Sequence, residues 1–302
     1  MTHIVCLIAN PELAPLEAPL VQELARTLGG EPHWLAEAEA CELAVVASER
    51  SELLARARGV VGDARIDLCV MPAARSPKRL LISDMDSTII TTECIDELAD
   101  LAGVGAKVAA ITRRAMNGEI DFTKSLVARA RWLEGLPATA YDEVYRERVH
   151  LMPGAATLVR TMRARGAYTA LVSGGFAPIA ERVQRAVGFD LAVANRLEVV
   201  DGRLTGRVLE PIQGPETKLE TLLQLSDSRG LDTEDAVAVG DGANDLPLLG
   251  AAGLGVAFRA HGHVAKAAQI TIVHGNLTAL LYLQGIARAD FVTTRASTDQ
   301  RT

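Results

Sequence analysis

Two aspartates, Asp84 and Asp86, directly follow an apolar run in the stretch "LLISDMDSTII". Most Asp-x-Asp pairs are turn or helix-cap residues, because their short carboxylates accept hydrogen bonds from nearby backbone N–H groups. The same spacing also suits metal binding or a chemical step. An EF-hand calcium loop is excluded, because Ile89 occupies the sixth loop position, where the sharp bend needs glycine. The role of the pair therefore depends on which other polar groups reach it.

Polar groups also follow two later segments that are predicted to be buried strands. Ser173 and two glycines follow one of them, and Asp241 follows the other. Lys218 lies in the first turn of a helix predicted between these two strands. In a doubly wound sheet, ligands bind outside the carboxyl ends of the strands. We therefore expect these side chains to meet the first aspartate pair in one crevice.

This set of groups suits phosphoryl transfer. Clustered carboxylates stay ionised together only when a cation lies among them, and oxygen ligands without His or Cys favour Mg²⁺. A hydroxyl, backbone amides and an ammonium group can bind phosphate oxygens and balance their charge. One carboxylate can attack phosphorus to give an aspartyl-phosphate, and a second can move the proton. The sequence therefore suggests phosphoryl transfer through an aspartate.

The elements that carry these groups alternate from residue 80 onward. Apolar and β-branched residues on both faces predict parallel strands covered by helices on either side. We predict a Rossmann-like α/β fold over 80–289, with strands at 80–84, 167–172, 235–240, 254–258 and 270–273 and helices at 155–165, 177–187 and 215–226. Residues 93–150 are charged and helical without a strand signal, which predicts an inserted helical cap. Asp201-Gly202 between short β runs predicts a hairpin.

The first 73 residues have a different plan. Their strand and helix signals follow the order βαββαβ, which is ferredoxin-like and resembles small ACT-type modules in layout only. The loop after the first strand, "ANPELAP", lacks the glycine that such modules usually carry at their ligand site. We predict a linker at 74–79 and, because periodicity is absent there, a flexible tail at 290–302.

The quartet D-M-D-S-T, S-G-G, a helix-borne K and G-D-G-A-N-D resembles the haloacid dehalogenase superfamily of phosphohydrolases. Within it the chain is similar to the phosphoserine phosphatases over about residues 80–288, through "DMDSTIITTECIDELA", "AMNGEIDFTKSL", "GLP", "LMPGA" and "VSGGF". The resemblance implies a nucleophile and metal ligand at Asp84, and a general acid/base at Asp86 whose backbone carbonyl also faces the metal. It further implies metal binding by Asp241, orientation of the metal's waters by Asp245, and phosphate contacts from Ser173, Gly174, Lys218 and Asn244.

The cap would carry specificity by the same resemblance. Glu93 matches the family's ammonium-binding glutamate, and Arg129 matches its carboxylate-binding arginine, with Arg131 as the alternative register. Met116 and Phe122 match apolar residues that close over the substrate. A guanidinium fork suits a carboxylate better than a lysine would. The implied substrate is therefore a small phosphorylated amino acid.

The implied function is Mg²⁺-dependent hydrolysis of O-phospho-L-serine to L-serine and phosphate, the last step of serine biosynthesis. Two alternatives stay open from sequence. One is another small-metabolite phosphatase, or a phosphotransferase that passes phosphate to an alcohol such as homoserine. The other is an amino-acid-sensing regulatory protein that uses the N-terminal module.

Composition narrows the partners. Net charge is −7, and no basic run interleaved with aromatics appears, which argues against nucleic acid as the main partner. Apolar runs fall short of the ~18–20 residues of a membrane span, and no signal-peptide pattern opens the chain. Four widely spaced cysteines (Cys6, Cys41, Cys69 and Cys94) predict buried thiols in a reducing cytoplasm. The sequence leaves a homodimer open, and His261 and His263 lack nearby partners for a metal site.

Overall fold

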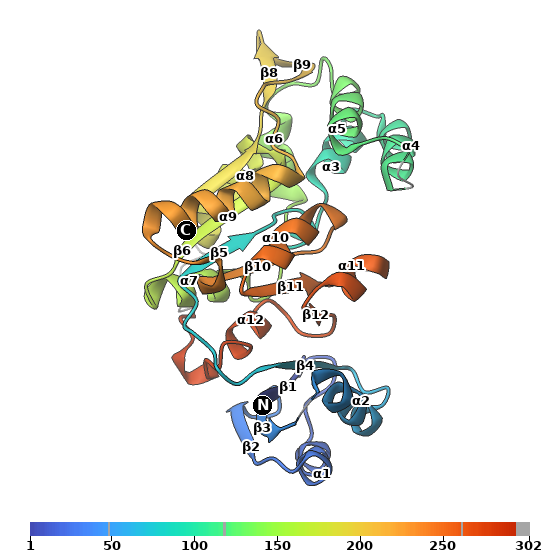
Figure 1. Cartoon of the computed structure of the whole chain (residues 1–302). Helices are drawn as coiled ribbons and strands as arrows, with labels where there is room; N and C mark the ends of the chain where they lie inside the picture. The colour runs from blue at the N-terminus through green and yellow to red at the C-terminus, as the bar shows by residue number, and fades with distance from the viewer. Residues whose placement is uncertain (48, 117–118, 261, 294–302) are drawn as a thin grey trace, which may run out of the picture.

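The computed structural model describes residues 1–47, 49–116, 119–260 and 262–293. Three parts follow one another along the molecule in Figure 1. A small four-stranded sheet with two helices lies at one end, a six-stranded sheet with helices on both faces lies in the middle, and a group of helices lies at the other end.

The N-terminal part has the predicted ferredoxin-like order. Its strands pair antiparallel in the order β2-β3-β1-β4, so the first and last strands are neighbours. One face of this sheet packs against both helices, and the opposite face carries a second row of buried apolar residues. The elements are β1 (Thr2–Ala9), α1 (Ala18–Leu28), β2 (Pro32–Ala36), β3 (Ala40–Val46), α2 (Arg50–Val61) and β4 (Ile66–Pro72).

The central sheet is parallel throughout, in the order β12-β11-β10-β5-β6-β7. Its strands are β5 (Leu80–Ser83), β6 (Tyr168–Phe176), β7 (Leu191–Asn195), β10 (Ala236–Gly240), β11 (Leu254–Phe258) and β12 (Ile270–Ile272). Alternation along β5 shows why both faces are covered: Leu81 joins the core under one helix layer, whereas Leu80 and Ile82 join the core under the other. The layers are α7 (Ala155–Ala164) and α8 (Ala177–Val187) on one side, and α9 (Pro215–Arg229) and α10 (Leu246–Ala251) on the other. The Rossmann-like prediction is confirmed.

The cap is inserted between β5 and α7. It contains α3 (Cys94–Leu101), α4 (Gly105–Met116), α5 (Phe122–Arg131) and α6 (Ala140–Glu147). Its two connections to the core run antiparallel, because Thr91 N donates to His150 O at 3.0 Å and Met152 N donates to Ile89 O at 2.8 Å. The bridge between Ile90 and Leu151 lies between these two hydrogen bonds, so the chain enters and leaves the cap at one place beside the sheet.

The sequence prediction missed one strand and the position of another element. β7 is only five residues long and is separated from the hairpin strand β8 by a single residue, so its signal merged with the hairpin segment beyond. The hairpin, β8 (Leu197–Val200) and β9 (Arg203–Val208), is confirmed, but it belongs with the cap in space (Figure 1). Gly135 N donates to Leu204 O at 2.8 Å, and the Gly206 backbone lies against Ala130 and Arg131.

The N-terminal part joins the central part through the second face of its sheet. Ile4, Cys6 and Met71 share one buried cluster with Leu281 and Tyr282 of the C-terminal region. Here a short helix, α12 (Ala279–Tyr282), lies between the two sheets in Figure 1. All four cysteines are free and buried, as the sequence predicted.

A buried carboxylate lies at the edge of this joint. Asp67 of β4 accepts hydrogen bonds from the backbone N–H groups of Val273, His274 and Gly275, at 2.7–3.1 Å. Nearby, Arg50 donates to the Val70 carbonyl within its own module and to the Gln269 carbonyl of the central part, at 2.8 and 2.7 Å. The Arg50 contact joins the residue before β12 to the N-terminal module, and the Asp67 contacts join the loop after β12 to it.

The C-terminal end is partly packed, which corrects the start of the predicted tail. The Phe291 ring lies 5.1 Å from the Tyr282 ring, and Val292 N donates to Thr161 Oγ1 at 2.9 Å. These contacts anchor residues that the sequence placed in the tail, because a lack of periodicity does not reveal tertiary contacts. Residues 294–302 lie outside the described part of the chain. Among the described residues, no helix combines the length and the apolar character needed to cross a membrane.

Candidate active site

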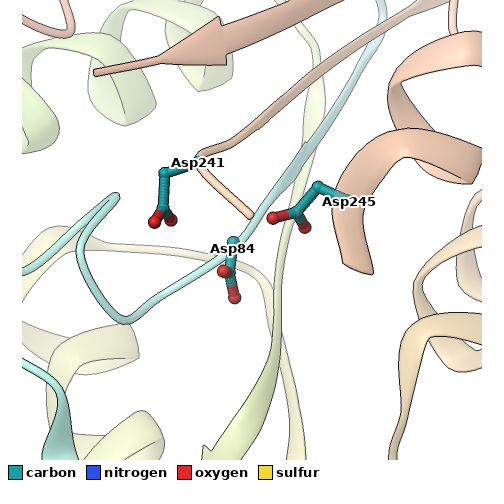
Figure 2. A group of neighbouring side chains, drawn as sticks. All are labelled: Asp84, Asp241 and Asp245. Atoms are coloured by element: carbon teal, nitrogen blue, oxygen red, sulfur yellow. The ribbon is translucent and has the colours of Figure 1, made fainter. Parts of the chain in front are cut away.

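Three carboxylates meet at the carboxyl edge of the central sheet. Asp84 follows β5, Asp241 follows β10, and Asp245 ends the short 3-10 turn after it. Figure 2 shows the three side chains grouped together, with Asp84 on one segment and Asp241 and Asp245 on another. One oxygen from each lies within 4.8 Å of the others, so the group can hold a metal ion.

Local backbone geometry sets the direction of Asp84. Asp84 N continues the strand pairing by donating to Val239 O at 3.0 Å. The chain then turns sharply, because the Met85 carbonyl accepts the N–H groups of the third to fifth residues after it and Ser87 has φ +54°. This turn carries Thr88 back to the crevice, where its hydroxyl donates to Asp241 Oδ1 at 2.8 Å.

Lys218 supplies the positive charge of the site. Its Nζ lies 2.9 Å from Asp84 Oδ1 and 2.5 Å from Asp245 Oδ1, and its side chain is almost fully buried. Burial by itself would lower the pKa of Lys218, but the Asp84 and Asp245 carboxylates outweigh it and raise that pKa. The lysine therefore stays charged.

One ammonium group does not balance three carboxylates. Burial raises the pKa of Asp84 well above its usual range, and Asp245 and Asp241 add to the effect while Lys218 opposes it. Burial also raises the pKa of Asp241, and the neighbouring Asp245 charge adds to this effect, whereas the hydrogen bond from Thr88 lowers the pKa. Fully ionised, the three carboxylates and the lysine carry a net charge of about −2. A divalent cation bound by oxygen ligands would relieve this repulsion, so the donor set fits Mg²⁺.

Asp86 lies beside the group of three carboxylates and is not one of its members. Its Oδ1 accepts a hydrogen bond from Cys94 N at 3.3 Å, and a Cβ at Gly175 would lie 2.7 Å from its Oδ2. Burial raises the pKa of Asp86 to about 6, although the hydrogen bonds to Cys94 lower it in part. A carboxyl group with this pKa can carry a proton near neutral pH and then release it.

The phosphate-loop candidates lie at the end of β6. Ser173 Oγ accepts the N–H of Gly175 at 2.9 Å, and the Gly174 carbonyl accepts Asn195 Nδ2 at 2.9 Å. Asn244 packs against Gly242 in the loop that also carries Asp241. In that loop, Asp245 Oδ2 accepts Gly242 N at 3.1 Å, so the carboxylate is held by backbone as well as by the lysine.

Asn195 was not among the sequence-predicted residues, although it is buried and lies beside the candidate loop. Its signal was present: the apolar run "LAVAN" ends in a polar residue, as the runs before Asp84, Ser173 and Asp241 do. The run is short and lies next to the hairpin segment, so the sequence pattern does not mark it as a separate strand of the sheet.

Two charged residues of the cap face the crevice. Ser87 Oγ donates to Glu93 Oε1 at 2.7 Å, and burial followed by the Asp86 charge raises the pKa of Glu93 to about 7, although its side chain reaches solvent. Burial lowers the pKa of Arg129, while Asp96, Glu93 and Asp86 act in the opposite direction. Arg131, the alternative in sequence, is exposed.

The cap also contacts the core through an aromatic ring. A Cβ at Gly174 would lie 2.7 Å from Phe122 Cζ, and a Cβ at Gly214 would lie 3.4 Å from Phe122 Cδ1. The ring therefore covers both glycines and closes the crevice from the cap side. Met116 ends α4, and its side chain lies outside the described part of the structure.

Several buried polar atoms near Glu93 and Arg129 have no hydrogen-bond partner in the described part of the chain. They are Thr92 Oγ1, Asp96 Oδ1 and Ser125 Oγ. Buried polar atoms without partners are rare, because each costs about 1–3 kcal/mol. Thr92 directly precedes Glu93, Asp96 lies in α3, and Ser125 lies one turn before Arg129 in α5, so these free polar atoms flank the two charged cap residues.

Comparison with known proteins gives one family. A model of the haloacid dehalogenase-like hydrolases matches residues 81–250. The chain is 44% identical over 233 residues to "Phosphoserine phosphatase SerB2" of Mycobacterium tuberculosis, covering 76% of this chain and 57% of that protein. It is 45% identical over 210 residues to the phosphoserine phosphatase of a Polaromonas species, covering 68% of this chain and 89% of that protein. The chain thus spans little more than half the length of the first relative.

The structural comparison covers both sheets. The unliganded crystal structure of a probable phosphoserine phosphatase from Vibrio cholerae superposes with a TM-score of 0.77 and 33% identity. The superposition covers 96% of this chain and 88% of that chain. The likeness therefore extends over the N-terminal module as well as the central part.

Proposed function

The chain belongs to the haloacid dehalogenase-like hydrolases, and we propose that it is a Mg²⁺-dependent phosphatase that hydrolyses O-phospho-L-serine to L-serine and phosphate. The observation that carries the proposal is the Asp84–Lys218 pair beside Asp241 and Asp245. A buried carboxylate held by an ammonium group, next to an oxygen-ligand metal site, suits attack on a phosphate ester.

Asp84 is the proposed nucleophile. One of its oxygens attacks phosphorus in line with the serine Oγ, so a P–O bond to the aspartate forms as the P–O bond to serine breaks. Asp86, with a pKa of about 6, donates its proton to the leaving serine oxygen. The products of this first step are free serine and an aspartyl-phosphate at position 84.

Water completes the reaction in the second step. Asp86, now ionised, accepts a proton from a water molecule that attacks phosphorus, and the bond to Asp84 breaks to release phosphate. Lys218 and the backbone amides near Ser173 and Gly174 balance the charge on the phosphoryl oxygens in both steps. A Mg²⁺ ion held by Asp84, Asp241 and the Asp86 carbonyl, with Asp245 beside it, would neutralise developing negative charge there. Asn244 is proposed to lie against the bound phosphate.

The cap selects the substrate in this proposal. Glu93 binds the ammonium group, Arg129 binds the carboxylate, and Met116 and Phe122 close over the bound molecule. The ring of Phe122 already covers Gly174 and Gly214. The names of the curated relatives, all phosphoserine phosphatases, support the same choice of substrate.

The physiological setting is part of the proposal. We place the protein in the cytoplasm, at the last step of serine biosynthesis, as a possible homodimer whose partner in the reaction is a small molecule. The described elements support a module at 1–73, a linker at 74–79 and a phosphatase domain at 80–289 with its cap near 93–150.

A substrate panel tests the proposal. Phosphate release is measured from O-phospho-L-serine, O-phospho-L-threonine and p-nitrophenyl phosphate, with Mg²⁺ or with EDTA, and with homoserine or glycerol as added acceptors. We expect the highest kcat/KM with phosphoserine, no turnover in EDTA, and free phosphate as the product even with acceptors present. Transfer of most phosphate to homoserine would instead identify a phosphotransferase.

Two neighbouring arginines provide a matched control for specificity. Arg129→Ala should raise KM for phosphoserine about tenfold or more, because a charged hydrogen-bonding partner of the carboxylate is lost. Arg131→Ala removes the same group from an exposed position and should leave KM unchanged. Equal effects of the two changes would refute the assignment of Arg129.

A further inference from the structure

We propose that Asn195 is a positioning residue for the reaction, because it joins the phosphate-binding end of β6 to the segment that carries Lys218. This inference rests on the proposed phosphatase reaction at the same site. Asn195 lies at the end of β7 and is 1% exposed. Its side-chain hydrogen bonds among the described residues go to Gly174 and Gln213, so its contribution comes through the two segments it connects.

The backbone of β6 is irregular beside Asn195. β6 and β7 pair regularly up to Val172 with Val193, and they pair again at Phe176 with Asn195. Between these points β6 advances four residues while β7 advances two, so Ser173, Gly174 and Gly175 bulge out of the ladder. The bulge displaces this part of β6 from the ladder toward the crevice, next to Asp86.

The Asn195 side chain replaces the missing ladder contact. One N–H of its amide donates to the Gly174 carbonyl at 2.9 Å, inside the bulge. The other donates to the Gln213 carbonyl at 2.9 Å, and its Oδ1 accepts Gln213 N at 2.8 Å. Both donors and the acceptor of the amide are thus used on backbone groups of two separate segments.

The second segment leads directly to the catalytic lysine. Gly214 follows Gln213, and α9 begins at Pro215 and carries Lys218 in its first turn. Fixing Gln213 therefore fixes the start of the helix that aims Lys218 at Asp84. The same two segments supply Gly174 and Gly214, the glycines that Phe122 covers. The Asn195 side chain therefore positions both the proposed phosphate-binding loop and the backbone against which the cap packs.

A same-size substitution tests this role. Asn195→Asp keeps an acceptor but removes both donors and places carboxylate oxygens against the Gly174 and Gln213 carbonyls. Because a shift of about 1 Å in reacting groups can cost on the order of 100-fold in rate, we expect kcat to fall by about that factor. The fall should be similar with phosphoserine and with p-nitrophenyl phosphate, since the phosphoryl site is common to both. Protection by inorganic phosphate against thermal unfolding should weaken in parallel.

The matched control lies at the other end of the same pair of strands. Asp190 Oδ2 accepts both the N–H and the hydroxyl of Thr169 at 2.9 Å, a polar link between β6 and the start of β7 far from the crevice. Asp190→Asn should lower the melting temperature and leave kcat per folded molecule within about threefold of the parent. Asn195→Ala, which adds no charge, should reproduce the kcat loss of Asn195→Asp.

The outcomes separate this inference from the proposed function. If the parent protein hydrolyses p-nitrophenyl phosphate but not phosphoserine, the proposed substrate is wrong and the test of Asn195 proceeds with the former. Near-parental kcat per folded molecule in both Asn195 variants would overturn the positioning role. So would an equal kcat loss in Asp190→Asn, since any link between these strands would then have the same effect.

Discussion

The buried carboxylate at the joint between the two sheets and the carboxylates in the crevice have opposite surroundings. Asp67 at the joint accepts hydrogen bonds from three consecutive backbone N–H groups. The crevice group of Asp84, Asp241 and Asp245 has one lysine for three carboxylates, and burial raises the pKa of the first two. The charge of Asp67 is satisfied within the chain, whereas the charge of the crevice group is not.

This difference distinguishes an aspartate that stabilises the fold from a group of aspartates that can hold a metal ion. A carboxylate whose oxygens are all occupied by N–H groups stabilises the fold and has no reason to bind anything else. A group of carboxylates that repel one another costs stability in the absence of a ligand, and a cation or a phosphoryl group and its metal relieve that cost.

The largest effect is expected at Asp84, the proposed nucleophile. Asp84→Asn keeps the shape of the side chain but replaces the carboxylate with a non-nucleophilic amide, so kcat should fall by at least about 10⁴-fold, as for other catalytic nucleophiles. Turnover is measured with phosphoserine, and labelling with beryllofluoride reports on the acyl-phosphate position. Asp67→Asn serves as the control and should retain kcat within about twofold. Full activity in Asp84→Asn would contradict the mechanism.

The next effect is on stability at the joint. Asp67→Ala leaves three backbone N–H groups without an acceptor, which should reduce the free energy of unfolding by about 3–5 kcal/mol. Chemical denaturation measures this change. Asp63→Ala removes an exposed carboxylate from the same module and should change it by less than about 0.5 kcal/mol. Similar changes in unfolding free energy for the two variants would mean that the hydrogen bonds to Asp67 do not contribute to stability.

The crevice should destabilise the metal-free protein as its carboxylates ionise. The folded-state pKa of Asp86 is about 6 and that of Glu93 is about 7, both above their unfolded values of 3.8 and 4.5. Their stabilising contribution is therefore complete below the unfolded pKa values and is lost as pH rises through the folded ones. In EDTA, Asp86 alone should account for a loss of about 2 kcal/mol between pH 4 and pH 7.

Two comparisons check this pH dependence. Asp86→Asn should flatten the curve of unfolding free energy against pH over that window, and Mg²⁺ should stabilise the parent more at pH 8 than at pH 5. An unchanged slope in the variant would show that other groups govern the pH dependence.

The smallest effect is expected at the cap. Glu93→Gln removes a charge that would bind the substrate ammonium group, so KM for phosphoserine should rise about tenfold, which corresponds to about 1.4 kcal/mol. For p-nitrophenyl phosphate, which has no ammonium group, kcat/KM should not change. A parallel loss with both substrates would place Glu93 in the phosphoryl chemistry and not in specificity.

Five of the six central strands could be predicted because each is a short apolar run ended by polar or glycine residues; β7 was the exception. The strand ends also pointed to Asp84, Ser173 and Asp241, since parallel strands place their carboxyl ends at one edge. The proximity of Lys218 to two carboxylates followed from the same topology. These features depend on local pattern and on the sheet plan, which a sequence carries.

Other features depend on contacts between distant segments. Asn195 hydrogen-bonds to Gly174 and to Gln213, which belong to two different segments. The residues next to Asn195 in the sequence do not indicate either of these partners. The hairpin of β8 and β9 was predicted as a hairpin, but its association with the cap requires a tertiary pairing. Phe291 was placed in a loose tail because a single aromatic residue has no periodicity.

The shared apolar cluster between the two sheets has a consequence for dissecting the molecule. Ile4, Cys6 and Met71 contribute to the same buried cluster as Leu281 and Tyr282. Each part therefore buries apolar residues against the other, and separating the two parts would expose these residues to water. A chain beginning at residue 80 would present this apolar surface to solvent and, we expect, would self-associate in light-scattering measurements where the full chain does not. The N-terminal module would then keep the phosphatase part soluble by covering its apolar surface. An exchange of this module between proteins would therefore have to include the surface that it covers.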